Sequence, residues 1–228
     1  MSLIIVGHGR MGRLVEQYAV AHGFTIAGIV TEETGPALLQ SREVRDVEAV
    51  IDFSVGPAVK TNLSLVADRG WNVVIGTTGW NADEAECRAI VDRTGIGVIA
   101  SANFSLGMNV FRRIVEDAAK RFAAMQDVGA WIHETHHIRK KDAPSGTALM
   151  LKSAMQGAGY ARNIDMSSTR AGSVPGTHEV GFDAPTETVT LTHTVRDRAV
   201  FAHGALEAAR WIAGRRGWFT MDDLINDW

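Results

Sequence analysis

Short apolar runs, each followed by a glycine or polar turn, recur through the first hundred residues. The first run, residues 3–6, is apolar at every position rather than at every second one, which is typical of a strand buried on both faces. Helical spacing of apolar residues follows several of these runs. The predicted strands are residues 3–6, 25–30, 49–52, 72–75 and 97–100, and the predicted helices include 57–69 and 82–93. This alternation predicts an α/β fold with a Rossmann-like, doubly wound parallel sheet.

The pattern changes after residue 104. A long helical stretch covers residues 106–125, and residues 128–135 then alternate like a half-buried strand. Ser145 begins a further helix that runs to about residue 157, and threonines alternate with other residues over 186–195, as in a sheet covered on one side. Helical spacing returns over 204–213. We therefore predict an inserted α+β domain over residues 104–204, with residues 1–103 and 205–228 forming the first domain.

Composition narrows the class of protein. With 228 residues and 46% hydrophobic content, the chain can bury one large core or two modest ones. A net charge of -3 without a long basic run argues against nucleic-acid or anionic-membrane partners. The longest uncharged run, 94–111, is broken by polar residues, so no membrane span is expected. Cys87 is the one cysteine and Arg10 comes too early for a signal peptide, which together favour a reducing, cytoplasmic location.

The turn after the first predicted strand carries a G-x-G-x-x-G motif at Gly7, Gly9 and Gly12. In a dinucleotide-binding turn the first glycine permits the tight bend, the second lets the backbone approach a pyrophosphate, and the third lets helix and strand pack closely. The position between a predicted strand and a predicted helix is the context that the motif requires. We predict dinucleotide binding; a purely structural glycine turn is the alternative.

Three polar turns follow later strands, at residues 52–54, 76–78 and 102–104. Ligands of open α/β sheets bind beyond the carboxyl ends of the strands. Each turn alone is ordinary, but together the three predict a lined cleft at that edge of the sheet.

Residues 134–147 concentrate proton-transfer and anion-binding groups. They contain adjacent histidines, His136 and His137, then Lys140, and a Ser-Gly-Thr helix start at 145–147. Histidine titrates near neutrality, and backbone N–H groups at a helix start bind anions. A solvated polar loop is the simpler interpretation, and the segment's place downstream of a dinucleotide fold favours the functional one.

Residues 133–137 also match the zinc-peptidase pattern H-E-x-x-H. Two ligands at that spacing can share one ion only on a helix. This segment is predicted to be a strand, in which four residues span about 13 Å. We therefore predict no metal site.

Over nearly its whole length the chain resembles the dihydrodipicolinate reductase (4-hydroxy-tetrahydrodipicolinate reductase) family. The most specific motif is Glu-x-His-His-x-x-Lys-x-Asp-Ala-Pro-Ser-Gly-Thr at 134–147; others lie at 7–12, 52–54, 76–79, 102–109, 170–172, 176–180 and 219–224. The resemblance implies a reductase of lysine and diaminopimelate biosynthesis. Such an enzyme transfers a hydride from NADH or NADPH to 4-hydroxy-tetrahydrodipicolinate, giving tetrahydrodipicolinate and water.

The resemblance also implies roles for single residues. His136 and Lys140 match the family's proton-transfer positions, and His137, Gly146 and Thr147 match those that hold the substrate's carboxylates. The residues themselves agree, because a dicarboxylate needs a cation such as Lys140 and N–H donors such as those of the helix start at Ser145, Gly146 and Thr147.

For the cofactor, the resemblance implies contacts with the glycine turn, two of the polar turns and a later arginine. The residues concerned are Gly7, Gly9, Arg10, Met11, Gly12, Gly76, Thr77, Thr78, Ser101, Ala102, Asn103, Phe104 and, more weakly, Arg198. It further implies that residues 104–204 bind the substrate and assemble the chain into a homotetramer.

Cofactor choice depends on the acidic Glu32, about 20 residues beyond the glycine turn. An acid there prefers the ribose 2′-hydroxyl of NAD, so NADH is favoured, with NADPH use left open. Two other functions also stay open: a related nicotinamide enzyme acting on another imine or aldehyde, and a non-catalytic dinucleotide sensor. A semialdehyde dehydrogenase would need a reactive cysteine, whereas Cys87 lies inside a predicted helix.

Overall fold

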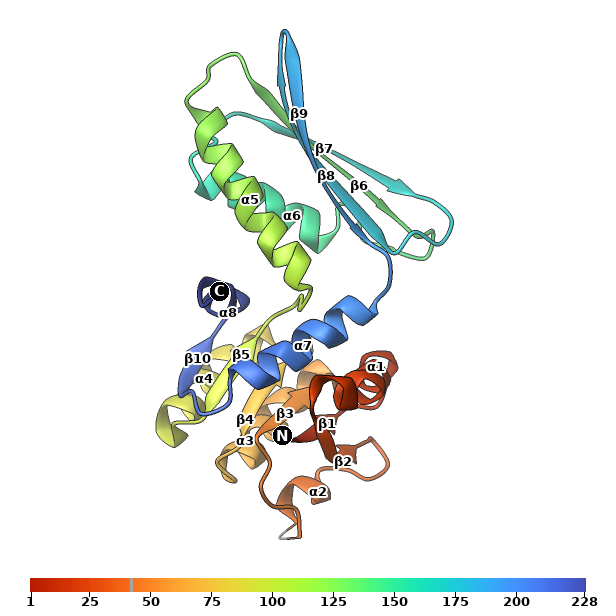
Figure 1. Cartoon of the computed structure of the whole chain (residues 1–228), viewed down its shortest axis with the longest axis vertical. Helices are drawn as coiled ribbons and strands as arrows, with labels where there is room; N and C mark the ends of the chain where they lie inside the picture. Colours follow the sequence, from red (N-terminus) through yellow and green to blue (C-terminus); the bar gives the residue numbers. More distant parts are fainter. Residues whose placement is uncertain (42) are drawn as a thin grey trace. The chain divides into compact units, whose positions relative to one another are not determined.

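The computed structural model describes residues 1–41 and 43–228, which form two compact units (Figure 1). Unit 1 contains residues 1–106 and 199–228, and unit 2 contains residues 107–198. The predicted second boundary, at 204/205, therefore lies at 198/199. The helix α7 (Ala199–Trp211) begins five residues before the predicted start at Gly204. Gly204 is an interior position of this helix, where a Cβ atom would lie 1.7 Å from the carbonyl oxygen of Phe104.

Unit 1 is built on a six-stranded parallel sheet in the order β10-β5-β4-β3-β1-β2. Its strands are β1 (Ser2–Val6), β2 (Thr25–Val30), β3 (Ala49–Asp52), β4 (Asn72–Ile75), β5 (Gly97–Ala100) and β10 (Gly217–Phe219). Because β1 pairs with both β2 and β3, the strand order reverses at β1. This reversal is the point at which doubly wound sheets bind ligands.

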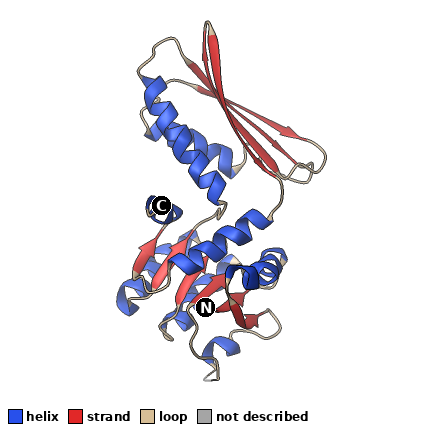
Figure 2. Ribbon diagram, viewed as in Figure 1, coloured by secondary structure: helices blue, strands red, loops and turns tan. Residues whose placement is uncertain are grey.

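Helices cover both faces of this sheet (Figure 2). One face carries α1 (Arg10–Ala19), α7 and α8 (Met221–Asn226), and the other carries α2 (Ala37–Gln40), α3 (Val59–Ala67) and α4 (Glu84–Thr94). Short 3-10 helices lie at Val20–His22, Gly56–Ala58 and Asn81–Asp83. In β1, Leu3 and Ile5 enter the first core and Ile4 and Val6 the second. Because successive side chains of β1 are buried on opposite faces of the sheet, its sequence is apolar at consecutive positions.

Unit 2 pairs a four-stranded sheet, ordered β7-β6-β8-β9, with two helices. The elements are α5 (Leu106–Ala123), β6 (Gly129–His136), α6 (Gly146–Gly157), β7 (Ile164–Arg170), β8 (Gly176–Ala184) and β9 (Glu187–Val195). Ala130, Ile132, Val180 and Phe182 share a core with α5 and α6, which lie on the same side of the sheet in Figure 1. The side chains that alternate with these residues form the outer face, where Thr190 of β9 is exposed.

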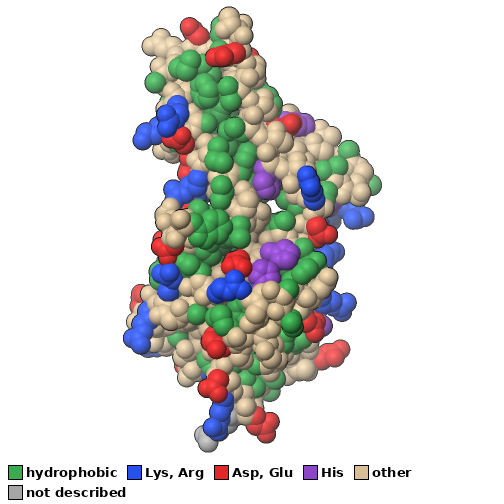
Figure 3. Space-filling model, viewed as in Figure 1, with side chains coloured by type: hydrophobic (Ala, Val, Ile, Leu, Met, Phe, Trp, Pro, Cys, Tyr) green, Lys and Arg blue, Asp and Glu red, His purple; other side chains and the backbone are tan. Residues whose placement is uncertain are grey.

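Among residues 1–41 and 43–228, no helix has the length and apolar character needed to cross a membrane. On the face drawn in Figure 3, basic side chains lie among acidic ones instead of gathering into one continuous area. This mixture agrees with the net charge of -3 and with the absence of a basic run in the sequence.

Candidate active site

The three motif glycines of the β1–α1 turn differ in their surroundings. A Cβ atom at Gly12 would lie 1.9 Å from the carbonyl oxygen of Gly7, and one at Gly7, whose φ is 89°, would lie 2.4 Å from the carbonyl oxygen of Phe53. Gly9 has no atom within 4 Å of such a position. The first and third glycines therefore serve packing, whereas the second leaves open space over the start of α1.

Gly9 is also the N-cap of α1 and provides no side-chain cap. The first N–H groups of a helix lack intrahelical acceptors and carry its positive dipole end, so this turn is suited to a phosphate. Arg10 is exposed and Met11 half-buried beside it.

A buried carboxylate orders the turns that follow β3 and β4. Asp52 is 2% exposed; its Oδ1 accepts hydrogen bonds from Ser54 N (2.8 Å), Ser54 Oγ (2.6 Å) and Thr77 Oγ1 (2.8 Å). Its Oδ2 accepts one from Asn62 Nδ2 at 3.0 Å. Thr77 is thereby held in place, while its neighbour Thr78 is exposed.

Aromatic packing and a local hydrogen-bond pair order the turn after β5. The Phe53 and Phe104 rings meet edge to face with centroids 6.4 Å apart, and a Cβ atom at Gly76 would lie 2.1 Å from the Phe53 ring. Ser101 Oγ donates to the carbonyl oxygen of Asn103 and accepts from its N–H, at 2.9 and 3.1 Å. The structure thus places the predicted residues 76–78 and 101–104 in ordered turns at the carboxyl ends of β4 and β5, with Ala102 exposed.

The predicted cofactor-selecting acid, Glu32, lies exposed in the turn that follows β2. Thr31 and Thr34 close this turn, since the N–H of Thr31 donates to Thr34 Oγ1 at 2.8 Å. The carboxylate therefore stands at the carboxyl end of the strand beside β1, where an adenosine ribose lies in dinucleotide folds.

In unit 2, a second buried carboxylate lies at the end of β6. Glu134 follows Ala130 and Ile132 on the inner face of the sheet and has no exposed surface. Its Oε1 accepts hydrogen bonds from Ser145 N (2.9 Å), Ser168 Oγ (2.8 Å) and Arg170 Nη2 (2.8 Å). Burial alone would raise the pKa of Glu134, but these hydrogen bonds outweigh it and lower the pKa to about 2. The group is a carboxylate at neutral pH.

Two histidines lie against the other oxygen of Glu134. Oε2 is 3.1 Å from His136 Nδ1 and 3.7 Å from Nε2 of His178, and the two imidazole rings meet edge to face at 5.1 Å. Burial lowers the pKa of His136, and it lowers the pKa of His178 to about 4. His178 is therefore neutral at pH 7.

Glu134, His136 and His178 offer three possible metal-ligand atoms within 4.8 Å of one another. The carboxylate, however, already binds a cation, the guanidinium of Arg170. This trio differs from the H-E-x-x-H pattern, whose first histidine, His133, hydrogen-bonds Ser167 Oγ at 2.8 Å. Residues 133–136 belong to the strand β6, as predicted from the alternation of apolar and polar residues.

The remaining predicted side chains of this site lie in the loop between β6 and α6 and at the last residue of unit 2. Lys140 Nζ lies 2.9 Å from Asp142 Oδ2, and Arg198 Nη2 donates to Nε2 of His137 at 3.3 Å. The resemblance assigned Arg198 to the cofactor and His137 to the substrate. In the structure these two side chains contact each other.

Ser145 has a different local role from Gly146 and Thr147. Its Oγ caps α6 by accepting from Ala148 N at 3.1 Å, and its N–H is taken by Glu134. Ser145 is 2% exposed, whereas Gly146 is exposed and Thr147 half-buried. The N–H groups of Gly146 and Thr147 begin the helix and are suited to an anion.

Sequence reasoning placed Asp52 in a turn of the predicted cleft without a role of its own, and it did not select Glu134, Arg170 or His178 as site residues. A signal was present for Glu134 and His136, since they continue the apolar face of the alternating strand. An ionisable group on such a face requires buried partners. Cys87 is fully buried in α4, and burial raises the pKa of its thiol to about 11, as expected of a packing residue.

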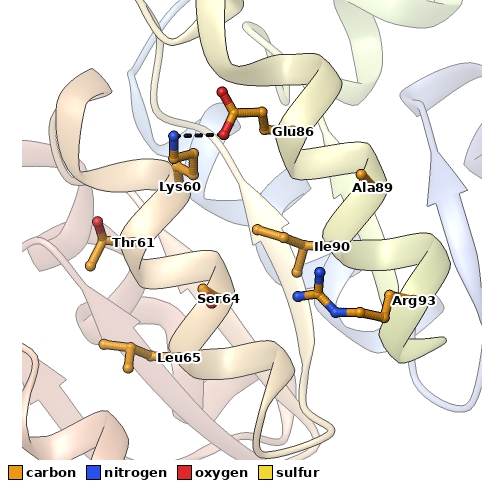
Figure 4. Close-up of a pocket in the computed structure, with 8 residues that line it drawn as sticks. All are labelled: Lys60, Thr61, Ser64, Leu65, Glu86, Ala89, Ile90 and Arg93. Carbon is orange, nitrogen blue, oxygen red and sulfur yellow. Dashed lines mark hydrogen bonds and ion pairs between the residues drawn. The ribbon is translucent and has the colours of Figure 1, made fainter.

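A groove of about 470 Å³ lies between α3 and α4 (Figure 4). Its lining is Lys60, Thr61, Ser64, Leu65, Glu86, Ala89, Ile90 and Arg93, none of which the sequence places in the site. Lys60 and Glu86 form an ion pair across it at 2.8 Å. Because the lining contains none of the predicted site residues, the groove is not the candidate site.

The two halves of the chain match two family models. Residues 1–104 match the N-terminal domain of dihydrodipicolinate reductase, and residues 107–225 match its C-terminal domain.

Relatives and a solved structure extend this match. The chain is 32% identical to a 4-hydroxy-tetrahydrodipicolinate reductase of Christiangramia forsetii, covering 100% of this chain and 98% of that protein. It is 34% identical to the protein of the same name from Archaeoglobus fulgidus, with 96% of each chain covered. The dipicolinate-bound dihydrodipicolinate reductase of Paenisporosarcina sp. TG-14 has the same fold, with a TM-score of 0.82, 18% identity and coverage of 96% of this chain and 97% of that one.

Proposed function

This chain belongs to the dihydrodipicolinate reductase family, and from that premise we propose how its two units divide the reaction. It is a nicotinamide-dependent 4-hydroxy-tetrahydrodipicolinate reductase of lysine and diaminopimelate biosynthesis. Unit 1 binds the dinucleotide at the carboxyl edge of its sheet, with the pyrophosphate over Gly9 and the start of α1. Unit 2 binds the cyclic dicarboxylate at the end of β6.

The observation that carries this assignment is the group of basic side chains and N–H donors between the end of β6 and the start of α6. Lys140, His137 and the N–H groups of Gly146 and Thr147 are suited to two carboxylates, because charge-assisted hydrogen bonds favour such ligands. Ser145 holds the helix start in place from within. The dipicolinate bound by the Paenisporosarcina enzyme is a ligand of this chemical class.

The reaction consumes a hydride and a proton and releases water, so an acid must act beside the ring. The nicotinamide supplies the hydride when it is bound. His136 and Lys140 are the groups we assign to the proton, since each presents a titratable nitrogen at the end of β6. His136 is buried and Lys140 is about three-quarters buried, with 24% of its side chain exposed.

The test is NADH oxidation with substrate freshly made from pyruvate and aspartate semialdehyde. The wild-type chain should turn over, and Lys140→Ala and His136→Ala should each lower kcat by roughly 100-fold or more. Lys141→Ala, next to Lys140, is the matched control and should retain near-normal kcat. A near-normal rate for Lys140→Ala would remove its assigned role and would favour a dinucleotide sensor or a reductase of another substrate.

For the cofactor, we propose that NADH is preferred and that NADPH is also used. The support is the exposed Glu32 after β2, because a carboxylate binds the ribose hydroxyls and repels a 2′-phosphate. Glu32→Ala should raise KM for NADH and lower it for NADPH, while Glu33→Ala should change neither. More than a tenfold preference of the wild-type enzyme for NADPH would contradict the role of Glu32.

We further propose a cytoplasmic homotetramer that assembles through the outer face of the unit 2 sheet. The helices α5 and α6 cover the inner face, while the outer face presents the threonines of β9 and the ring of Trp131 lying against Gly181. The single, buried Cys87 fits a reducing compartment.

A further inference from the structure

We propose that Glu134 is a positioning residue for His136, and that His136 exchanges its proton through Nε2 while its Nδ1 faces the Glu134 carboxylate. This inference rests on the proposed role of His136 in proton transfer. Glu134 is then a further residue of the site, and Nε2 is the atom of His136 that gives up the proton.

The surroundings of Glu134 fix the carboxylate in place. Oε1 accepts hydrogen bonds from three donors on two different elements: the N–H of Ser145 at the start of α6, and the side chains of Ser168 and Arg170 on β7. Because these three hydrogen bonds all converge on Oε1 from two elements, the carboxylate cannot swing away from its neighbours without breaking them.

The second oxygen is left for His136. Within the part of the chain that the structure describes, Glu134 Oε2 and His136 Nδ1 are both buried and have no hydrogen-bond partner, yet they lie 3.1 Å apart. The distance is that of an ion pair when the ring is protonated. Buried polar atoms require hydrogen-bond partners. His136 Nδ1 is closer to Glu134 Oε2 than His178 Nε2 is, at 3.1 Å against 3.7 Å.

The other ring nitrogen lies close to the backbone of Gly176 and not to a side chain at that position. A Cβ atom at Gly176, the first residue of β8, would lie 3.1 Å from His136 Nε2. Because Gly176 carries no side chain, nothing from that position crowds Nε2. Nδ1 faces the Glu134 carboxylate, so Nε2 is the ring nitrogen left to exchange a proton, because the partner of one histidine nitrogen determines the role of the other.

Charges around His136 determine the expected pH effect. On its own strand Glu134 favours the imidazolium, as does Asp142 in the following turn; Lys140 and Arg170 oppose it, and burial opposes it most. His178 of β8 faces the same oxygen and is the remaining titratable neighbour. Neutralising Glu134 removes the nearest favourable charge, so the pKa of His136 should fall further and less of the protonated acid should remain at neutral pH.

The first experiment compares pH profiles of kcat for Glu134→Gln and Ser168→Ala. Glutamine keeps the shape of the side chain and loses its charge. The basic limb of the kcat profile should therefore move to lower pH, and kcat at pH values above that limb should fall about tenfold or more. KM for NADH should not change. Ser168→Ala removes one donor to Oε1 but keeps the charge, and its limb should stay at the wild-type pH. A Glu134→Gln limb at the wild-type position would overturn the proposal.

The second experiment measures the wild-type protein and needs a variant only to assign the signal. In the wild-type protein labelled with ¹⁵N-histidine, neutral His136, assigned by comparison with His136→Gln, should carry its proton on Nδ1. A proton on Nε2 would overturn the proposal even if activity is normal. If instead His136→Gln retains the wild-type rate, the proposed function of His136 fails, while the ¹⁵N spectrum still decides whether Glu134 positions the ring.

Discussion

At the scale of single residues, substitutions at two glycines of the same motif should have different effects: one on cofactor binding and the other on stability. Gly9→Ala introduces a methyl group into open space and should leave the melting temperature of the free protein nearly unchanged, while weakening NADH binding, because the methyl group keeps a pyrophosphate from the backbone. Gly12→Ala places the same group 1.9 Å from the carbonyl oxygen of Gly7 and should cost about 1–3 kcal/mol of unfolding free energy or more. Denaturation without cofactor and NADH titration separate the two effects. Equal stability of the two variants would contradict this account.

The buried His178 makes stability depend on pH. Its folded-state pKa, about 4, lies below the ordinary value of 6.5, so the unfolded chain binds a proton more readily between these values. Stability should be fully present above pH 6.5 and should fall by up to about 3 kcal/mol as the pH drops to 4. Glu134 adds a further loss below about pH 4.5, because its folded pKa is about 2. Urea unfolding at pH 7 and pH 4.5 measures the effect.

The matched variant for that experiment is His178→Gln, whose amide can replace Nε2 against Ser145 Oγ. Glutamine does not titrate, so the loss of stability between pH 7 and pH 4.5 should become smaller. An unchanged pH dependence would assign the acid sensitivity to groups other than His178.

At the scale of elements, the sequence predicted the strands that form continuous apolar runs. Of the strands β1 to β5, all but the edge strand β2 are buried over most of their length, and the bounds of all five agree with the prediction to within one residue. The strands β7, β8 and β10 were missed. In β7 most side chains are polar, β8 has two glycines and a histidine on buried positions, and β10 has three residues, so pairing with neighbours determines these strands more than local pattern does.

The site was predictable to the same extent. Adjacent groups such as His136, Lys140 and the helix start at Ser145 lie in one segment and can be found from its residues. Glu134 acquires its role from Ser168 and Arg170, more than 30 residues away along the chain. These donors reach the carboxylate because β7 pairs in parallel with β6, and no local sequence pattern predicts that pairing.

The C-terminal helix carries a separate prediction, because the helical spacing found in the sequence ends at residue 213. This helix, α8, has a capping box between Thr220 and Asp223, and Leu224 is 1% exposed in the first core. Leu224→Ala should therefore cost about 2–4 kcal/mol of unfolding free energy. Ile225→Ala, at a partly buried neighbouring position, should cost clearly less in the same denaturation experiment. Equal, small losses would show that α8 is dispensable for unit 1.

At the scale of the whole molecule, the chain crosses between its units only near residues 106 and 198. Each unit has its own core and its own ligand chemistry: helix starts and polar turns in unit 1, cations and a buried carboxylate in unit 2. Substitutions in the core of one unit should therefore leave the ligand-binding residues of the other intact, which lets cofactor and substrate binding be tested separately.

The outer face of the unit 2 sheet carries the last prediction. Thr190 is exposed on β9 opposite Gly181, against which the Trp131 ring lies. If this face joins copies of the chain, Thr190→Glu buries four equivalent carboxylates in the tetramer without partners, which desolvation strongly opposes. Light scattering at a matched concentration should then show smaller assemblies. Val20→Glu, on a 78% exposed position of unit 1, should leave the mass unchanged. A Thr190→Glu variant with wild-type mass would exclude this face as the interface.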